Sequence, residues 1–326
     1  MKKMKMKHTD HWAVGVDLGG TKIEVARVDS AGRVQERLRR PTPVKEGPNA
    51  VKKVIVDLVR RLRKLAGPPL GVGIGLAGQI DPSEGLVIFA PNLNWHDVPF
   101  QSDLKQSLEW PIVITNDVRA VTWGEWLHGA GKDCNDLVCL FIGTGIGGGV
   151  VSGGRILTGC SNTAGELGHM TIDLNGPLCT CGSRGCFEAL AGGWAIEKMA
   201  RDAIALDPVA GVQLIKLAGG SPRDVTAKTV AEAAHAGDLL GLRLVEQTAQ
   251  SLIAGVTSVV NAFNPCLVIL GGGVLEGLPE LIDQIDMGVR KRALPAATAS
   301  LQVLPSKLGN DAGVVGAAAL AMKTFG

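Results

Sequence analysis

The stretch Thr163-Ala-Gly-Glu-Leu-Gly-His-Met170 and the motif Cys179-Thr-Cys-Gly-Ser-Arg-Gly-Cys186-Phe-Glu188 decide how the rest of this chain is interpreted. Three thiols and one imidazole fall within one short, loop-rich segment. Gly182 and Gly185 supply the backbone freedom that turns such a loop back on itself. Three cysteines and one histidine are typical of a structural zinc site whose coordination positions are all filled by protein. The sequence therefore predicts a zinc site formed by His169, Cys179, Cys181 and Cys186.

The alternative is that these cysteines are merely small buried hydrophobic residues. That explanation suffices for the four cysteines outside the motif, which lie in apolar or scattered contexts: Cys134, Cys139, Cys160 and Cys266. It suits the motif less well, because the spacing is tight and a histidine lies upstream. A disulfide is not favoured, since the rest of the chain is typical of a cytosolic protein. We expect a metal to fix the loop so that Glu166, Glu188 and His169 face a polar substrate.

Length and composition restrict the protein classes that remain. At 326 residues the chain is long enough for two domains, and 46% hydrophobic residues can bury an ample core. The net charge of +2 provides no electrostatic surface for nucleic acid or an anionic membrane. The basic run 1–7 is followed by no apolar signal core, and no apolar stretch is long enough to span a bilayer. We therefore expect a cytoplasmic protein that binds neither nucleic acid nor membrane.

Three glycine turns each follow a short apolar segment that is typical of a strand. The segments 13–18, 137–142 and 265–270 lead into Asp17-Leu-Gly-Gly-Thr-Lys22, Gly143-Thr-Gly-Ile-Gly-Gly148 and Gly271-Gly-Gly273. The first turn offers backbone N–H groups, a hydroxyl and an ammonium group, which together suit a phosphate. Taken alone, it is explained equally well as an ordinary glycine hairpin. The three turns together indicate a backbone wrapped around a nucleotide from several directions.

The nucleotide site is not of the Rossmann or Walker type. A G-x-G-x-x-G pattern at Gly73, Gly75 and Gly78 is followed by turn residues 79–85 instead of the helix that a dinucleotide fold requires. The match that begins at Gly143 fails the same test, because a β-hairpin is predicted to continue over 149–153. No Walker A sequence is present.

The remaining segments show both strand and helix patterns. Helices are predicted over 48–66, 188–204 and 238–263 and in the small-residue segment that ends at 322, and 91–95 is expected to be a loop. The segment 110–117 is predicted to be a strand that ends on Asn116 and Asp117. Without further information, Asp117 would be interpreted as the N-cap of the next helix, and Glu188 as compensation for a helix dipole.

Taken together, the glycine turns, Asn116-Asp117, Glu166-Leu-Gly-His169 and the cysteine motif resemble the ROK family, and within it the bacterial ATP-dependent glucokinases. The resemblance is collinear over nearly the whole chain. It implies a two-domain α/β fold of the actin-like, hexokinase and Hsp70 type, with the active site in the interdomain cleft. The small domain would comprise 12–118 plus 312–326, and the large domain, carrying the zinc loop, 119–311.

The resemblance also implies residue roles. Asp117 matches the general base that accepts the proton of the sugar 6-hydroxyl. Sugar contacts are implied for Gly78, Asn116, Asp117, Glu166, His169 and Glu188. Nucleotide contacts are implied for Asp17, Gly19, Gly20, Thr21, Lys22, Gly143, Thr144, Gly145, Gly147, Gly271, Gly272 and Gly273. His169 would double as a ligand of structural Zn, with Cys179, Cys181 and Cys186, and Mg²⁺ would accompany ATP.

Three functions are compatible with this resemblance. The first is phosphorylation of glucose by ATP, and the second is the same reaction on N-acetylmannosamine, mannose, fructose or allose, for which Asn92 and Asn94 could be selective. The third is a sugar-sensing transcriptional repressor, which is disfavoured because only about a dozen residues precede the first strand and the net charge is near zero. Relatives are usually homodimers, and polyphosphate remains open as the donor.

Overall fold

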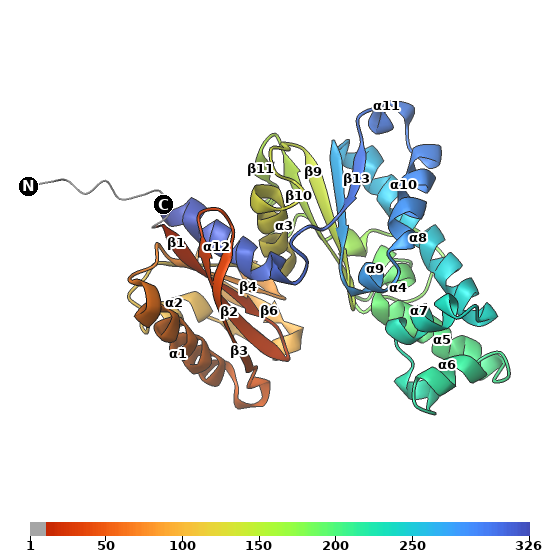
Figure 1. Cartoon of the computed structure of the whole chain (residues 1–326), viewed down its shortest axis with the longest axis horizontal. Helices are drawn as coiled ribbons and strands as arrows, with labels where there is room; N and C mark the ends of the chain where they lie inside the picture. Colours follow the sequence, from red (N-terminus) through yellow and green to blue (C-terminus); the bar gives the residue numbers. More distant parts are fainter. Residues whose placement is uncertain (1–10) are drawn as a thin grey trace, which may run out of the picture. The chain divides into compact units, whose positions relative to one another are not determined.

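The computed structural model describes residues 11–326 of the chain. These residues form two compact units, each with its own sheet and core (Figure 1). Unit 1 contains the chain up to Cys134 together with Ile156–Ala164 and Lys307–Gly326. Unit 2 contains Asn135–Arg155 and Gly165–Ser306.

The sheet of unit 1 has the strand order β3-β2-β1-β4-β8. β1 pairs antiparallel with β2, and β2 with β3, whereas β1, β4 and β8 run parallel. The carboxyl ends of these three parallel strands therefore lie along one edge of the sheet. The strands are β1 (Trp12–Leu18), β2 (Lys22–Asp29), β3 (Val34–Pro41), β4 (Val72–Leu76) and β8 (Ile112–Asn116).

Helices cover both faces of this sheet. On one face, the strands share a buried core with α1 (Pro48–Ala66) and α2 (Phe100–Lys105). On the other face, α12 (Ala312–Phe325) packs on the strands and on α3 (Asp117–His128). Glycine allows this close approach, because a Cβ at Gly15 would lie 1.8 Å from the carbonyl oxygen of Val314, and one at Gly73 1.8 Å from that of Ala317. Gly73, part of the rejected dinucleotide pattern, therefore has a packing role.

Shorter elements complete unit 1. A small antiparallel sheet has the order β5-β6-β7. Its strands are β5 (Gln79–Asp81), β6 (Leu86–Ala90) and β7 (Trp95–Val98). Elsewhere in unit 1, short 3-10 helices are η1 (Val44–Glu46), η2 (Pro91–Leu93) and η5 (Gly309–Asp311). The predicted loop 91–95 is thus a 3-10 turn that leads into β7.

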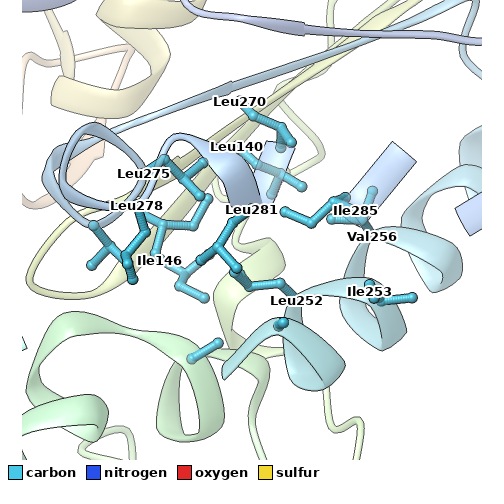
Figure 2. Packing of buried hydrophobic residues seen from close by; sticks show 14 of the residues in the cluster. Leu140, Ile146, Leu252, Ile253, Val256, Leu270, Leu275, Leu278, Leu281 and Ile285 are labelled. Carbon is cyan, nitrogen blue, oxygen red and sulfur yellow. The ribbon is translucent and has the colours of Figure 1, made fainter. Parts of the chain in front are cut away.

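The sheet of unit 2 has the order β11-β10-β9-β12-β13. β9, β12 and β13 run parallel, and β10 is antiparallel to β9. The strands are β9 (Leu137–Ile142), β10 (Ile146–Ser152), β11 (Arg155–Ile156), β12 (Leu267–Gly271) and β13 (Gln302–Pro305). Leu140 and Leu270 point from the sheet into a core that they share with Leu252 and Val256 of the long helix α8 (Figure 2).

The predicted long helix of unit 2 is α8 (Leu239–Phe263). Its N-cap is Asp238, whose carboxylate accepts a hydrogen bond from the Gly241 N–H. The others are η3 (Leu167–His169), α4 (Phe187–Ala191), α5 (Gly193–Leu206), α6 (Val212–Leu217), η4 (Pro222–Asp224), α7 (Ala227–His235), α9 (Gly273–Gly277), α10 (Glu280–Arg292) and α11 (Pro295–Thr298). Among residues 11–326, no helix combines the length and the apolar character that a membrane crossing requires.

Two of the predicted elements are wrong in extent. The helix expected over 188–204 is two helices, because Gly192 adopts an extended conformation (φ −69°, ψ 157°) and the chain turns there before α5 begins. The second glycine turn is predicted to extend to Gly148, with the hairpin continuing from 149, but β10 already begins at Ile146. Glycines 147–149 therefore lie in a strand.

Candidate functional site

The candidate residues fall into two sets, one in each unit, and each set is described by itself. In unit 1 they lie at the shared edge where β1, β4 and β8 end. In unit 2 they lie in the loop that carries the cysteine motif and in the turns that follow β9 and β12.

Asn116 and Asp117 stand at the junction between β8 and α3. Asn116 is the N-cap of α3: its Oδ1 accepts from the N–H of Arg119 at 3.1 Å, and its Nδ2 lies 3.5 Å from the carbonyl oxygen of Gly78. Asp117 is the first residue of the helix, where its Oδ1 accepts from the Val118 N–H at 2.9 Å. The interpretation of Asp117 as the N-cap is therefore wrong, since Asn116 provides that cap.

Asp17 lies close enough to Asp117 for their charges to interact. Burial, together with the negative charges of Asp117 and Glu24, raises the pKa of Asp17 to about 6, against the lowering effect of Lys22. Two neighbouring carboxyl groups at one sheet edge make a local negative site that a hard divalent cation would compensate.

The Gly19–Lys22 turn is held from two sides. Thr42 donates from Oγ1 to the Gly19 carbonyl oxygen at 2.7 Å and from its N–H to the Thr21 carbonyl oxygen at 3.0 Å. On the other side, a Cβ at Gly20 would lie 2.8 Å from the carbonyl oxygen of Asn92, so only glycine fits without displacing backbone. The turn is thus a rigid, backbone-lined surface.

Lys22 is part of a charged cluster that the sequence did not reveal. Its ammonium group lies 3.4 Å from the carboxylate of Glu24, which is 1% exposed. Glu24 also pairs with Arg37 at 3.1 Å and with Arg39 at 2.8 Å. A buried carboxylate requires such partners. Neither Glu24 nor Thr42 belongs to a recognisable motif, so only their contacts identify them.

In unit 2, the four predicted metal ligands converge. The ligand atoms of His169, Cys179, Cys181 and Cys186 all lie within 4.8 Å of one another. Cys179 Sγ is 3.8 Å from His169 Nδ1, and Cys181 Sγ is 3.7 Å from Cys186 Sγ. With Zn–S bonds of about 2.3 Å, the sulfur ligands of a tetrahedral zinc ion lie about 3.8 Å apart. The donor set therefore fits zinc in both type and spacing.

The backbone of this loop requires glycine at the predicted positions. Gly182 (φ 90°) and Gly185 (φ 64°) are both in the left-handed region, and a Cβ at Gly185 would lie 1.5 Å from the Asp173 carbonyl oxygen. Burial raises the pKa of the Cys186 thiol to about 12. That thiol would hold its proton at neutral pH unless a bound cation compensated the thiolate charge.

His169 and Glu166 lie at the two ends of η3 and are both exposed. Because Nδ1 of His169 faces Cys179, the other ring nitrogen, Nε2, is available for a different partner. A histidine that faces a metal site with one nitrogen and a substrate with the other is compatible with this geometry.

Glu188 is held by groups outside its own helix. Its Oε2 accepts from the Ile146 N–H at 2.9 Å, and its Oε1 accepts from the indole N–H of Trp194 at 3.1 Å. Glu188 also lies in the first turn of α4, as the helix-dipole alternative requires, but that alternative does not account for the two donors that hold its carboxylate. Trp194 belongs to no recognisable motif, and its only sequence signal is its position after Gly192-Gly193.

The two glycine turns of unit 2 both follow strands of the sheet, as predicted. Gly143 closes its turn by donating to the Gly145 carbonyl oxygen at 2.9 Å, and Thr144 is exposed. After β12, Gly272 adopts φ 96°, and a Cβ there would lie 2.5 Å from the Ile142 carbonyl oxygen. Gly273 has open space around its Cβ position.

Comparisons with known proteins agree with the motifs. The family model described as "ROK family" matches residues 13–324. The glucokinase of Thermotoga maritima is 36% identical over 96% of this chain and 98% of its own length. A xylose repressor of Bacillus subtilis is 30% identical over 96% of this chain and 78% of its own length.

A solved structure supports the same assignment. The ROK family glucokinase from Streptomyces griseus, in complex with glucose and AMPPNP, is 34% identical, with a TM-score of 0.82 over 96% of this chain and 99% of that one. The expected α/β fold of actin-like sugar kinases is thereby confirmed.

Proposed function

The chain belongs to the ROK family, and from this we propose that it is a sugar kinase that transfers phosphate from ATP to the 6-hydroxyl of glucose. The observation that carries the proposal is full-length similarity to glucokinases combined with the positions of Asn116 and Asp117 at the end of β8. Other hexoses and a repressor role are not favoured.

In unit 1, we assign Asp117 as the general base. A sugar alcohol is a weak nucleophile at neutral pH, and a carboxylate within hydrogen-bond reach accepts its proton as the phosphoryl group moves. The helix cap formed by Asn116 fixes the backbone beside Asp117. Asn116 and Gly78 are assigned to the sugar.

The Asp17–Lys22 turn is assigned to the phosphates of ATP and to Mg²⁺. When bound, Mg²⁺ neutralises charge on the phosphate oxygens. Such a cation would also compensate the negative charge of Asp17, whose pKa is raised by burial and by the neighbouring Asp117. The backbone of Gly19 and Gly20 allows a phosphate group to approach closely.

In unit 2, Glu166, His169 and Glu188 are assigned to sugar hydroxyls, 143–147 to the phosphates, and 271–273 to the adenosine side. A carboxylate has about four lone-pair positions, and Glu188 uses two of them within the protein. The remaining two can accept from adjacent hydroxyls. Such acceptors reject sugars that lack the hydroxyl, because they would be left without a partner.

A structural zinc ion held by His169, Cys179, Cys181 and Cys186 would supply the charge that keeps the loop closed. We further propose that units 1 and 2 are the small and large domains of the family, and that the protein is a homodimer. Free thiols and use of ATP are consistent with a cytoplasmic location.

The test is a coupled ADP assay of the purified protein with MgATP and a panel of hexoses. Glucose should be the preferred substrate. Asp117→Asn should lower kcat by about 100- to 10,000-fold while glucose binding, measured by calorimetry, persists. Absence of ADP formation with glucose, or full turnover by Asp117→Asn, would exclude the proposed mechanism.

A further inference from the structure

Trp194 contacts three parts of unit 2 that the proposed function uses separately. It is the second residue of α5. Its indole N–H donates to Oε1 of Glu188 at 3.1 Å, and its backbone N–H donates to the carbonyl oxygen of Thr144 at 2.9 Å. Its ring packs against the small buried cluster formed by Cys179, Cys186 and Ala189. The side chain of Trp194 thus contacts the cysteine loop and a proposed sugar ligand, and its backbone binds the first residues after β9.

The Glu188 carboxylate is bound on its other side by the start of β10. Oε2 accepts from the Ile146 N–H at 2.9 Å, and it lies so close to Gly145 that a Cβ on that residue would be 2.1 Å from it. The neighbouring Gly193 N–H donates to the Gly143 carbonyl oxygen at 2.9 Å. The turn over 143–145 and the start of α5 are therefore joined by two backbone hydrogen bonds, and the carboxylate accepts from Ile146 on one side and from the side chain of Trp194 on the other.

A carboxylate held by one donor on each oxygen has a defined orientation. The terminal torsion of a glutamate is otherwise broad and roughly two-fold, so a single donor would leave the plane of the group free to turn. With both oxygens bound, the two remaining lone pairs point in fixed directions. Loss of the indole donor would release this orientation without removing the charge.

We propose that Trp194 is a positioning residue that sets the orientation of the Glu188 carboxylate for sugar hydroxyls, an inference that rests on the proposed sugar-kinase function. It acts through Glu188 and does not itself contact the sugar. The same residue links the sugar side of unit 2 to the turn over 143–145, since its backbone holds Thr144.

The test is the variant Trp194→Phe, which keeps an aromatic ring against the cysteine loop and removes only the indole donor. Glucose affinity, measured by calorimetry, should weaken about tenfold, as expected for a lost hydrogen bond to a charged group. Zinc content per chain should stay unchanged, and the melting temperature should fall by no more than a few degrees. A role of the ring in packing alone would instead leave glucose affinity unchanged, because phenylalanine keeps the ring.

The matched control is Trp126→Phe. Trp126 also donates its indole N–H, to the carbonyl oxygen of Cys134 at 2.9 Å, but it belongs to unit 1 and has no assigned role. This variant should bind glucose like the wild type. An equal weakening in both variants would mean that loss of any buried indole donor loosens the protein, and would overturn the proposal.

A second variant shows whether the effect passes through Glu188. In a Glu188→Gln background, adding Trp194→Phe should weaken glucose binding little further, because residues that act as a unit are not additive. Full additivity, unchanged glucose affinity in Trp194→Phe, or loss of zinc from it would each overturn the inference. A wild-type protein that neither binds nor phosphorylates glucose would overturn the proposed function itself.

Discussion

Replacing Gly145 with alanine should damage sugar binding while leaving the fold intact. The added Cβ would lie 2.1 Å from Oε2 of Glu188 and 2.9 Å from its carboxyl carbon, and nothing else comes closer than 3.5 Å. The backbone at Gly145 is not in the left-handed region, so alanine can adopt it. The flexible end of the Glu188 side chain must therefore give way.

The size of the effect follows from that displacement. To restore ordinary contact, the carboxylate must move by about 1 Å or more, which breaks its hydrogen bond with the Ile146 N–H and misaligns its free lone pairs. The displaced carboxylate would lose the hydrogen bond that it is proposed to accept from a sugar hydroxyl, and a hydrogen bond to a charged group contributes about 1.5–3 kcal/mol. Glucose affinity should thus fall by about 10- to 150-fold.

The assay is glucose binding by calorimetry, with the melting temperature measured on the same samples. Gly277→Ala is the matched control, because its Cβ would meet only Ala231 at an ordinary 3.7 Å. If Gly145→Ala binds glucose like the wild type, Glu188 does not need its observed position. If it melts many degrees lower, the backbone yields instead of the carboxylate, and the reasoning is refuted.

Three other outcomes are expected. The pKa of Asp17 is raised from 3.8 to about 6, so the folded protein favours the protonated carboxyl. As pH rises from about 3.8 to above about 6, this carboxyl ionises and the free energy of unfolding falls by at most ~3 kcal/mol. Asp17→Asn should therefore have a higher melting temperature than the wild type at about pH 8 and the same melting temperature at about pH 3.5. It should also lose MgATP turnover. The absence of a difference in melting temperature at about pH 8 would contradict this. Cys181→Ser should lose bound zinc, measured by metal analysis, and bind glucose more weakly, whereas Cys266→Ser should keep both; a zinc-free wild type would refute the metal assignment. Thr42→Val should raise the KM for MgATP by about five- to tenfold without changing glucose affinity, and Thr42→Ser should restore it, because the hydrogen bond from Oγ1 to Gly19 returns; an equal effect of both variants would point to packing instead.

Much of the fold could be predicted because its signals are local. The helix over 48–66 shows a clear 3.6-residue period and is observed as Pro48–Ala66. The strand over 137–142 is an apolar run bounded by glycine and is observed as Leu137–Ile142. The three glycine turns follow strands as expected, because consecutive glycines after an apolar run commonly mark the end of a strand.

The incorrect boundaries arose where a distant contact overrides the local pattern. The residues after the cysteine loop keep a helical period through Gly192, yet the chain breaks there so that Gly193 and Trp194 can bond to the turn over 143–145. Similarly, β10 begins early because Ile146 pairs with Ile142 across the hairpin. Hydrophobic periodicity describes only the residues of one short segment, and these contacts join that segment to residues outside it.

By itself, the sequence indicated the α/β class, the family and the four residues of the candidate metal site, because short motifs carry these through residue type and spacing. The tertiary structure alone decided that Asn116 and not Asp117 caps α3, that Asp17 is raised in pKa beside a residue 100 positions away, and that Trp194 and Ile146 hold Glu188. Electrostatic shifts and hydrogen bonds depend on distances in space, and folding sets those distances between residues that no local pattern connects.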